Sequence, residues 1–211
     1  MTISRDAVLD WLKAFAAEIE AQKDYLTQLD AAIGDADHGA NMHRGLQTSL
    51  AKVQSVADKD IGTIFKTVGM TLVSTVGGAA GPLYGTMFMQ MGTASAGKME
   101  LSLTDWVATF EAGVNGVVMR GKANLGDKTM VDALTPALNA LKESVANGAS
   151  TGVALQKAAE AAAQGRDATI PMVAKKGRAS YLGERSAGHL DPGAASSTIM
   201  LQTAANTWAT S

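Results

Sequence analysis

Hydrophobic residues recur along this chain with the 3.6-residue period of an α-helix, and alternating β-branched runs are missing. The first such stretch follows Ser4, a favourable N-cap residue. Its apolar positions follow an i, i+3, i+4, i+7, i+11 pattern: Val8, Trp11, Leu12, Phe15 and Ile19. Similar stripes begin at Ile61 and Leu134, and the pair Ser102 and Asp105 has the S-x-x-D form of a helix start. We therefore expect an all-α protein without a sheet.

Segments rich in glycine or proline separate these helical stretches, among them GDADHG, GGAAGP, GKANLG, NGASTG and HLDPG. The predicted helices span residues 5–31, 40–57, 60–75, 82–96, 103–120, 129–147, 151–169 and 192–208. Because short connections favour antiparallel neighbours, the fold is predicted to be a bundle or barrel of eight antiparallel up-and-down helices. Residues 1–211 are expected to form a single domain. Pro136 predicts a kink or a late start in its helix.

Composition narrows the functional classes. A chain of 211 residues that is 46% hydrophobic can bury a substantial core, and its net charge of −2 argues against general affinity for nucleic acid or anionic membranes. No run of apolar residues is long enough to span a bilayer, and no signal peptide is seen. The lack of cysteine excludes thiolate catalysis and thiolate metal sites, and it fits a cytoplasmic location.

The stretch LTQLDAAIGDADHGANMHRG, residues 26–45, concentrates acidic side chains at a glycine-flanked turn. Asp30, Asp35 and Asp37 can converge there, with His38 and Asn41 close by. Carboxylate oxygens without histidine or thiolate partners suit a hard cation, Mg²⁺ or Ca²⁺, and Mg²⁺ usually keeps positions open for phosphates. The spacing is not that of an EF-hand. The alternative is that Asp35 and Asp37 cap the next helix and lie in water.

Two further segments expose backbone amides. In GGAAGPLYG, residues 77–85, small residues precede Pro82 at a helix start, where an anion can approach the bare N–H groups. The alternative is tight packing of two helices at a turn. In DPGAAS, residues 191–196, Asp191 is a predicted N-cap and Pro192 the first helical residue. This makes a second anion site or simply a stable helix start.

The segment 173–191, VAKKGRASYLGERSAGHLD, is the one long connection without helical period, and such loops are usually functional or disordered. It contains four basic residues, Lys175, Lys176, Arg178 and Arg185. They are either phosphate ligands, part of a lid or docking surface, or simply a solvated basic patch. A carboxylate cluster, two amide-rich helix starts and a basic loop are together the parts that hold a polyphosphate. Antiparallel helices can bring these loops to one end of the barrel, so a polyphosphate site is expected there.

Four motifs carry a resemblance to a known family: LDAAIGDADHGANMHRG, STVGGAAGPLYG, RGKANLGDKTMVD and KKGRASYLGERSAGHLDPGA. In this order, and over nearly the whole chain, they resemble the L subunit, or nucleotide-binding domain, of dihydroxyacetone kinases. The resemblance implies a barrel of eight antiparallel helices that binds ADP or ATP through two Mg²⁺ ions. The three aspartates that hold these ions match Asp30, Asp35 and Asp37.

The resemblance also implies nucleotide contacts, which fall on His38, Asn41, Ala79, Ala80, Gly121, Met130, Arg178, Asp191, Pro192 and Gly193. Amides at Ala79 and Ala80 would face phosphate, and Gly121 and Met130 would line the adenine pocket. Arg178 would be the catalytic cation that stabilises the transferring phosphoryl group. Many relatives read GGAS where this chain reads GGAA, so a serine hydroxyl contact is missing while the backbone contacts are retained.

The resemblance implies partners as well. A K subunit would carry dihydroxyacetone, and an M subunit, a phosphohistidine protein of the phosphoenolpyruvate phosphotransferase system, would rephosphorylate ADP that stays bound. Some relatives also contact a transcription activator. The alternative donor is free ATP, used for dihydroxyacetone or another short ketose. Two other classes stay open: a dinuclear-magnesium hydrolase of nucleotide conjugates, and a nucleotide-responsive binding module that docks through the 173–191 loop.

Overall fold

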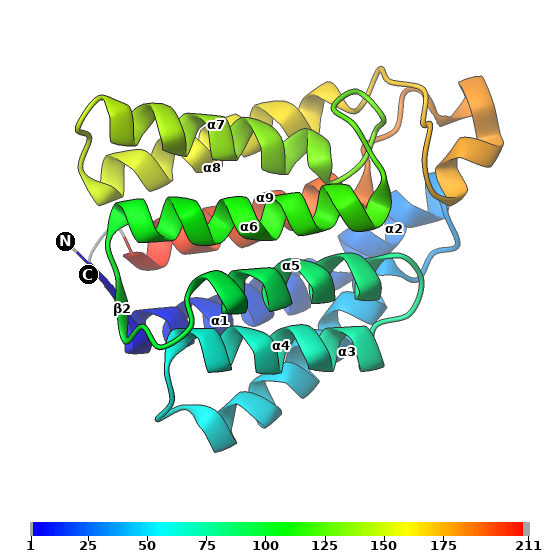
Figure 1. The fold of residues 1–211 in the computed structure, drawn as a ribbon. Helices are drawn as coiled ribbons and strands as arrows, with labels where there is room; N and C mark the ends of the chain where they lie inside the picture. The colour runs from blue at the N-terminus through cyan, green and yellow to red at the C-terminus, as the bar shows by residue number, and fades with distance from the viewer. Residues whose placement is uncertain (1, 209–211) are drawn as a thin grey trace.

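In the computed structural model, which describes residues 2–208, antiparallel helices form a closed barrel in which consecutive helices are neighbours (Figure 1). The α-helices are α1 (Arg5–Ala21), α2 (Lys23–Ile33), α3 (His38–Val53), α4 (Ile61–Thr75), α5 (Ala80–Ala94), α6 (Leu103–Gly121), α7 (Val131–Ala146), α8 (Thr151–Ala168) and α9 (Pro192–Trp208). Helix α9 packs against both α8 and α1, which closes the ring. The predicted all-α antiparallel barrel is confirmed.

The prediction of one helix over residues 5–31 was wrong, because the chain breaks at Gln22 into α1 and α2. Gln22 leaves the helical region (φ −101°, ψ 12°), and its carbonyl accepts the N–H of Leu26 at 2.9 Å, so α2 begins directly. Ile19 and Leu26 are seven residues apart and so lie on one face of a continuous helix, and neither glycine nor proline marks the break. The break redirects α2 against α3 and α9, which brings Asp30 to one end of the barrel.

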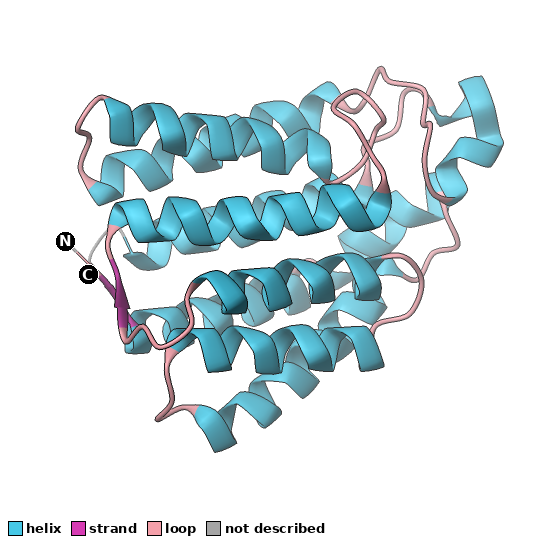
Figure 2. Ribbon diagram, viewed as in Figure 1, coloured by secondary structure: helices cyan, strands magenta, loops and turns pink. Residues whose placement is uncertain are grey.

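The expectation that a sheet would be absent was wrong in one small respect. Strand β1 (Ile3–Ser4) pairs antiparallel with β2 (Glu100–Leu101), near the chain ends (Figure 2). Two residues are too few to show alternation in the sequence. The described part of the chain also contains two 3₁₀-helices, η1 (Gln54–Val56) and η2 (Arg178–Ser186), and η2 makes part of the long 173–191 connection regular.

Local sequence signals explain several helix boundaries. The N-cap predicted at Ser4 is present, since Ser4 Oγ accepts the N–H of Ala7 at 3.1 Å. The pair Ser102 and Asp105 forms a reciprocal capping box at the start of α6. Pro136 lies inside α7, which begins at Val131, two residues later than predicted. These caps satisfy N–H groups that would otherwise lack partners at the helix ends.

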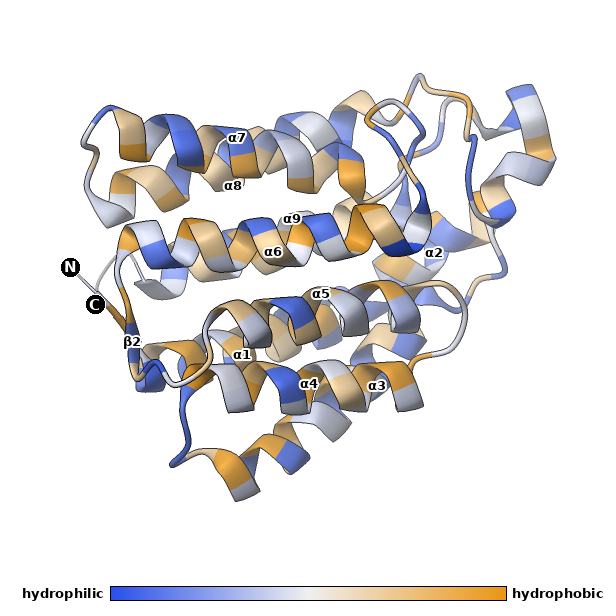
Figure 3. Cartoon of the chain, in the orientation of Figure 1, coloured by the Kyte–Doolittle hydropathy of each residue, from blue (hydrophilic) through white to orange (hydrophobic). Residues whose placement is uncertain are grey.

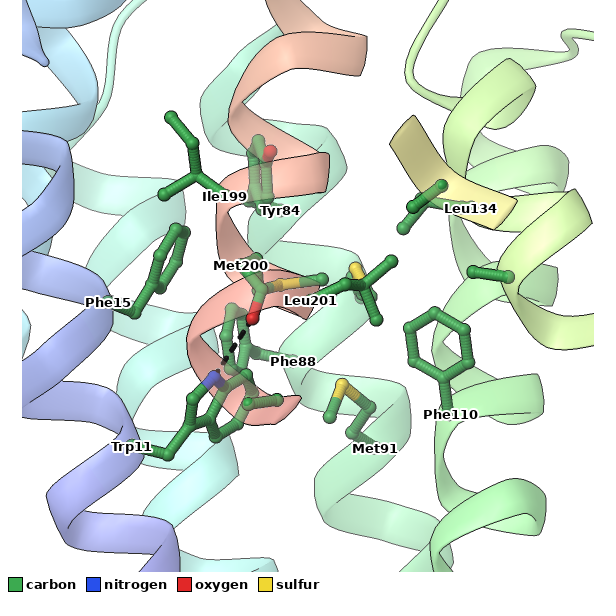
Figure 4. Close-up of a cluster of buried hydrophobic side chains, with 14 of the residues drawn as sticks. Trp11, Phe15, Tyr84, Phe88, Met91, Phe110, Leu134, Ile199, Met200 and Leu201 are labelled. Atoms are coloured by element: carbon green, nitrogen blue, oxygen red, sulfur yellow. Dashed lines mark hydrogen bonds between the residues drawn. The ribbon is translucent and has the colours of Figure 1, made fainter. Parts of the chain in front are cut away.

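Buried aromatic and aliphatic side chains fill the core between α1, α5, α6 and α9 (Figure 4). The Trp208 ring lies 5.1 Å from that of Trp11 and 4.8 Å from that of Trp106, measured between centroids. Each buried indole of the first pair has a partner: Trp11 Nε1 donates to the carbonyl of Met200 at 3.0 Å, and Trp208 Nε1 to that of Ala7 at 2.9 Å. Helix α9 is buried over most of its surface, and it therefore presents its N-terminus at a fixed place.

The two ends of the barrel differ. The chain ends and the small sheet lie at one end, whereas the loops that follow α2, α4, α6 and α8 gather at the other (Figure 1). Hydrophilic and hydrophobic residues are interspersed along the outer helices (Figure 3). Within residues 2–208, no helix is both long and apolar enough to cross a membrane. The loop-bearing end is where the residues singled out in the sequence meet.

Candidate functional site

The loops at this end surround a cavity of about 440 Å³, within the usual range for a small-molecule site. All the site residues predicted from the sequence line it: Asp30, Asp35, Asp37, His38, Asn41, Ala79, Ala80, Gly121, Met130, Arg178, Asp191, Pro192 and Gly193. They come from the starts or ends of six helices and from the 173–191 segment. Their convergence is a finding of the structure, while their roles as ligands of a metal or nucleotide stay predictions.

The three aspartates form a compact carboxylate cluster. One oxygen from each of Asp30, Asp35 and Asp37 lies within 4.8 Å of the other two. Asp30 is buried on α2, and its Oδ2 accepts the N–H groups of Asp37 at 2.8 Å and His38 at 3.1 Å. Asp37 precedes α3, but its side chain makes no capping bond. That observation weakens the alternative in which Asp37 serves only as a helix cap.

The backbone conformation of the turn between α2 and α3 determines where these carboxylates lie. Ala36 adopts a left-handed conformation (φ 61°), which costs an L-residue roughly 1–2 kcal/mol. The bonds from the next two amides to Asp30 offset part of that cost and hold the turn against α2. Oxygen ligands alone, one buried and two more accessible, fit a hard cation that also takes phosphate oxygens.

Gly34 is the point at which this turn tolerates no side chain. A Cβ added there would lie 1.9 Å from Asp30 Oδ1. We expect Gly34→Ala to displace the Asp30 carboxylate and to weaken Mg²⁺-dependent nucleotide binding by about 10-fold or more, as loss of a ligand-orienting contact does. Titration calorimetry with Mg²⁺ and ADP measures this.

The matched control is Gly62→Ala on α4, where a Cβ would lie 2.6 Å from the carbonyl oxygen of Gly92. Both changes add one methyl group at a close approach, but Gly62 is not among the residues that line the cavity. Gly62→Ala should lower the melting temperature and leave nucleotide affinity unchanged. Equal loss of affinity in both variants would show that Gly34 acts through general stability.

His38 is held by a buried chain of hydroxyl groups. His38 Nε2 lies 2.9 Å from Ser196 Oγ, which lies 2.7 Å from the hydroxyl oxygen of Tyr84. Tyr84 also contacts Ser197 Oγ at 3.0 Å. Burial lowers the pKa of His38, against the opposing effect of Asp30 and Asp37. Burial raises the pKa of Tyr84 to about 12, so the phenol stays protonated.

Asn41 is oriented by a residue that the sequence did not single out. Arg44 donates from Nη2 to Asn41 Oδ1 at 2.6 Å and to the carbonyl of Thr75 at 3.1 Å. This leaves the Asn41 amide nitrogen facing Gly77, where an added Cβ would lie 3.2 Å away. Arg44 thereby links the start of α3 to the loop that precedes α5.

Two helix starts face the cavity as predicted, and they differ in their caps. Helix α5 has no side-chain cap at Ala79, so the amides of its first turn have no side-chain acceptor at that end. In α9, Asp191 Oδ2 accepts the N–H of Ala194 at 2.7 Å, as expected for an N-cap followed by Pro192. Gly121 lies beside Leu83 on the apolar side of the cavity.

The basic segment divides into residues that reach the cavity and residues that do not. Arg178 and Lys176 line it, and Arg178 Nη2 lies 3.0 Å from Asp35 Oδ2. Lys175 instead faces Asp127, with Nζ 3.7 Å from Oδ1, and neither Lys175 nor Arg185 lines the cavity. The cavity therefore has a carboxylate cluster with a guanidinium directly beside it.

Asp191 titrates in an unusual range. Burial raises its pKa from 3.8 to about 7, against the opposing effects of the Ala194 amide and Lys128. Between these two values the folded protein binds more protons than the unfolded chain. The free energy of unfolding should therefore fall as pH rises from about 4 to about 7, by up to about 4 kcal/mol from this group.

Asp191→Asn removes the titration and keeps an oxygen for the cap. Relative to the parent chain, the melting temperature of this variant should rise between about pH 4 and about pH 8. Asp24→Asn, on the exposed side of α2, is the control and should show no such trend. A constant difference between Asp191→Asn and the parent at all pH values would contradict the assignment.

Three residues near the cavity were not predicted from the sequence to belong to the site. Tyr84, Lys128 and Arg44 all lie inside quoted motifs but were not singled out. Lysine and arginine are mostly exposed, so nothing local marks a buried Lys128 or an orienting Arg44. The proximity of Tyr84 to a helix start that faces the cavity was the one usable signal.

Comparisons with known proteins agree with this geometry. The family model described as "DAK2 domain" matches residues 32–206. The "PEP-dependent dihydroxyacetone kinase, ADP-binding subunit DhaL" of Escherichia coli (strain K12) is 47% identical over 202 residues, 96% of each chain. Its counterpart 1 from Listeria innocua is 44% identical, over 96% of this chain and 98% of that protein.

Among solved structures, the "dihydroxyacetone kinase from C. freundii in complex with AMP-PNP and Mg2+" matches with a TM-score of 0.71 at 25% identity. The alignment covers 94% of this chain and 33% of the kinase. The family model covers most of this chain, and curated relatives match it over nearly their full lengths. The chain therefore belongs to the DAK2 domain family.

Proposed function

We propose that this chain is the ADP-binding subunit of a phosphoenolpyruvate-dependent dihydroxyacetone kinase. The observation that carries the proposal is the meeting of a three-carboxylate cluster, an uncapped helix start and Arg178 in one cavity. Relatives at 41–47% identity are named as ADP-binding subunits of such kinases, which supports the same role here. Cytoplasmic location is part of the proposal.

The residues present fit ADP with Mg²⁺. When bound, Mg²⁺-ADP would supply the phosphoryl-transfer chemistry, and the residues of the cavity would hold it in place. Asp30, Asp35 and Asp37 would hold two Mg²⁺ ions through carboxylate oxygens. The first-turn amides of α5 would bind phosphate oxygens. The apolar side of the cavity, near Gly121 and Met130, would receive adenine.

This chain contributes positioning and charge neutralisation to the reaction. Phosphoryl transfer needs no protein nucleophile when cations and amides are already placed around the transferring group. Arg178, 65% exposed and beside Asp35, can face an incoming phosphoryl group at the mouth of the cavity. His38 is held by a buried hydrogen bond and Asn41 by a partly buried one, so little reorganisation is needed when the site is occupied.

The partners in this proposal are a K subunit that carries dihydroxyacetone and an M subunit that donates a phosphoryl group from phosphohistidine. Because the transferred group must pass between subunits, both partners would approach the loop-bearing end. Docking of a transcription activator on this same end is a further expectation.

Reconstitution tests the proposal. The chain, with purified K and M subunits, should phosphorylate dihydroxyacetone when phosphoenolpyruvate drives the phosphohistidine donor, and the rate should be unchanged by added ATP. Turnover with ATP alone, in the absence of the M subunit, would instead support the ATP-dependent kinase of dihydroxyacetone or another short ketose. Cleavage of a nucleotide conjugate by the isolated chain would support the hydrolase.

A further inference from the structure

Lys128 is a buried cation at the edge of the cavity. It is 1% exposed and adopts a left-handed backbone conformation (φ 63°). Lysine is almost never fully buried unless it is paired. Here its ammonium donates to three backbone carbonyls: Thr169 at 2.6 Å, Ile170 at 3.4 Å, and His189. An ammonium has three donors, so these contacts use its full capacity.

These carbonyls belong to the two ends of one segment. Thr169 and Ile170 directly follow α8, and His189 lies two residues before the N-cap of α9. The same ends are joined by the bond from Asp191 N–H to Thr169 Oγ1 at 3.1 Å and from Gly188 N–H to the carbonyl of Ile170 at 2.8 Å. Residues 169–191 therefore form a loop whose base is closed, with Lys128 at the closure.

The outer part of this loop carries the cation that faces the carboxylates. It contains η2, in which Tyr181 is 87% exposed and Ser186 is the one buried residue. Arg178 lies at the start of η2 and reaches Asp35. Because the outer part buries so little, its position depends on few contacts: the base of the loop, a bond from Lys175 N–H to the carbonyl of Asp127, and the packing of η2 against α2.

The chemistry at Lys128 favours an indirect role. Burial lowers the pKa of Lys128, while the carboxylates of Asp191 and Asp132 raise it. Although Lys128 lines the cavity, its N–H groups point to loop carbonyls, so a bound phosphate would find none of them free without a break in the loop closure. A lysine that served only as a phosphate ligand would keep its donors directed at the cavity.

We propose that Lys128 is a positioning residue for phosphoryl transfer: it closes the base of the 169–191 loop and so holds Arg178 beside the carboxylate cluster. This inference rests on the proposed function for its kinetic consequence, but its structural consequence is independent of that function.

Lys128→Met keeps most of the side-chain volume and removes every donor. In the purified chain, measured without nucleotide and again with Mg²⁺-ADP, backbone amide hydrogen exchange across residues 170–188 should become faster, while exchange in α4 to α6 stays the same. The transfer rate in the reconstituted kinase should fall about 10- to 100-fold, as for residues that orient a catalytic group, with the Kd for Mg²⁺-ADP changed less than the rate.

A double-mutant cycle separates positioning from general destabilisation. If Lys128 acts through Arg178, Lys128→Met should lower the rate much less in an Arg178→Ala background than in the parent. Lys157→Met, an exposed lysine change on α8, is the matched control and should alter neither exchange nor rate. Where Lys128→Met does not fold, Lys128→Gln, which retains an amide donor, replaces it in all measurements.

The outcomes are distinct. Unchanged exchange across residues 170–188, or an equal loss of rate in both backgrounds, overturns the role of Lys128. A parent chain that transfers no phosphoryl group overturns the proposed function, and the exchange measurement then decides on Lys128 alone. Selective loosening of the loop together with a non-additive loss of rate supports the inference.

Discussion

Asp35→Asn and Asp37→Asn should each abolish retention of Mg²⁺-ADP while leaving the helical content intact. Neither side chain supports the fold: Asp35 is exposed and Asp37 half-buried, and neither caps α3. Asparagine is nearly isosteric but removes the charge that holds a hard cation. The loss of affinity should exceed the roughly 10- to 100-fold that follows from changing an outer partner of a metal ligand.

Circular dichroism and titration calorimetry with Mg²⁺ and ADP make this comparison. Asp24→Asn, an equivalent loss of charge on exposed α2 surface, is the control and should bind like the parent. Asp30→Asn differs from both, because Asp30 also accepts two backbone amides of the turn, and it should lower stability as well as binding. Undiminished binding in both the Asp35 and Asp37 variants would remove the metal assignment.

Arg178→Ala should slow phosphoryl transfer by about 100-fold or more while weakening Mg²⁺-ADP binding far less. Removal of one donor aimed at developing charge typically costs roughly 10²–10³ in kcat, and cationic arginines in phosphoryl transfer are worth more. Arg178 lies at the mouth of the cavity beside Asp35, where a group that arrives from a partner would meet it.

Pre-steady-state transfer rates and equilibrium Kd values, measured on the same preparations, separate the two effects. Arg178→Lys retains a charge but loses the planar fork, so its rate should fall between those of the parent and Arg178→Ala. If the Kd and the rate change by equal factors, Arg178 is a ligand of the bound state and does not act specifically on the transferring group.

Much of the fold follows from local pattern. Apolar stripes such as the one that contains Trp11 and Phe15 can face a core only as helices, and glycine-rich turns between them leave antiparallel packing as the simple solution. The break at Gln22 could not be predicted, because Ile19 and Leu26 on either side of it keep the phase of one helix. The α2 helix is instead placed by its packing against α3 and α9.

The candidate site was predictable where chemistry is concentrated in short motifs. Asp30 near the end of α2 and Asp35 and Asp37 in the turn that follows lie within eight positions of the sequence, and an antiparallel barrel brings distant loops to the same end. Lys128 was hidden because its role depends on carbonyls some forty residues away along the chain. No local rule predicts a buried lysine, so contacts of this kind can be identified only from the three-dimensional structure.

The most direct measurement is to purify the chain without added nucleotide, denature it, and identify what is released by chromatography together with a magnesium assay. The account predicts one ADP per chain with two Mg²⁺ ions, retained through purification. An empty protein that exchanges ATP freely would indicate the ATP-dependent kinase. A protein that releases no nucleotide and binds neither ADP nor ATP in the presence of Mg²⁺ would contradict the account.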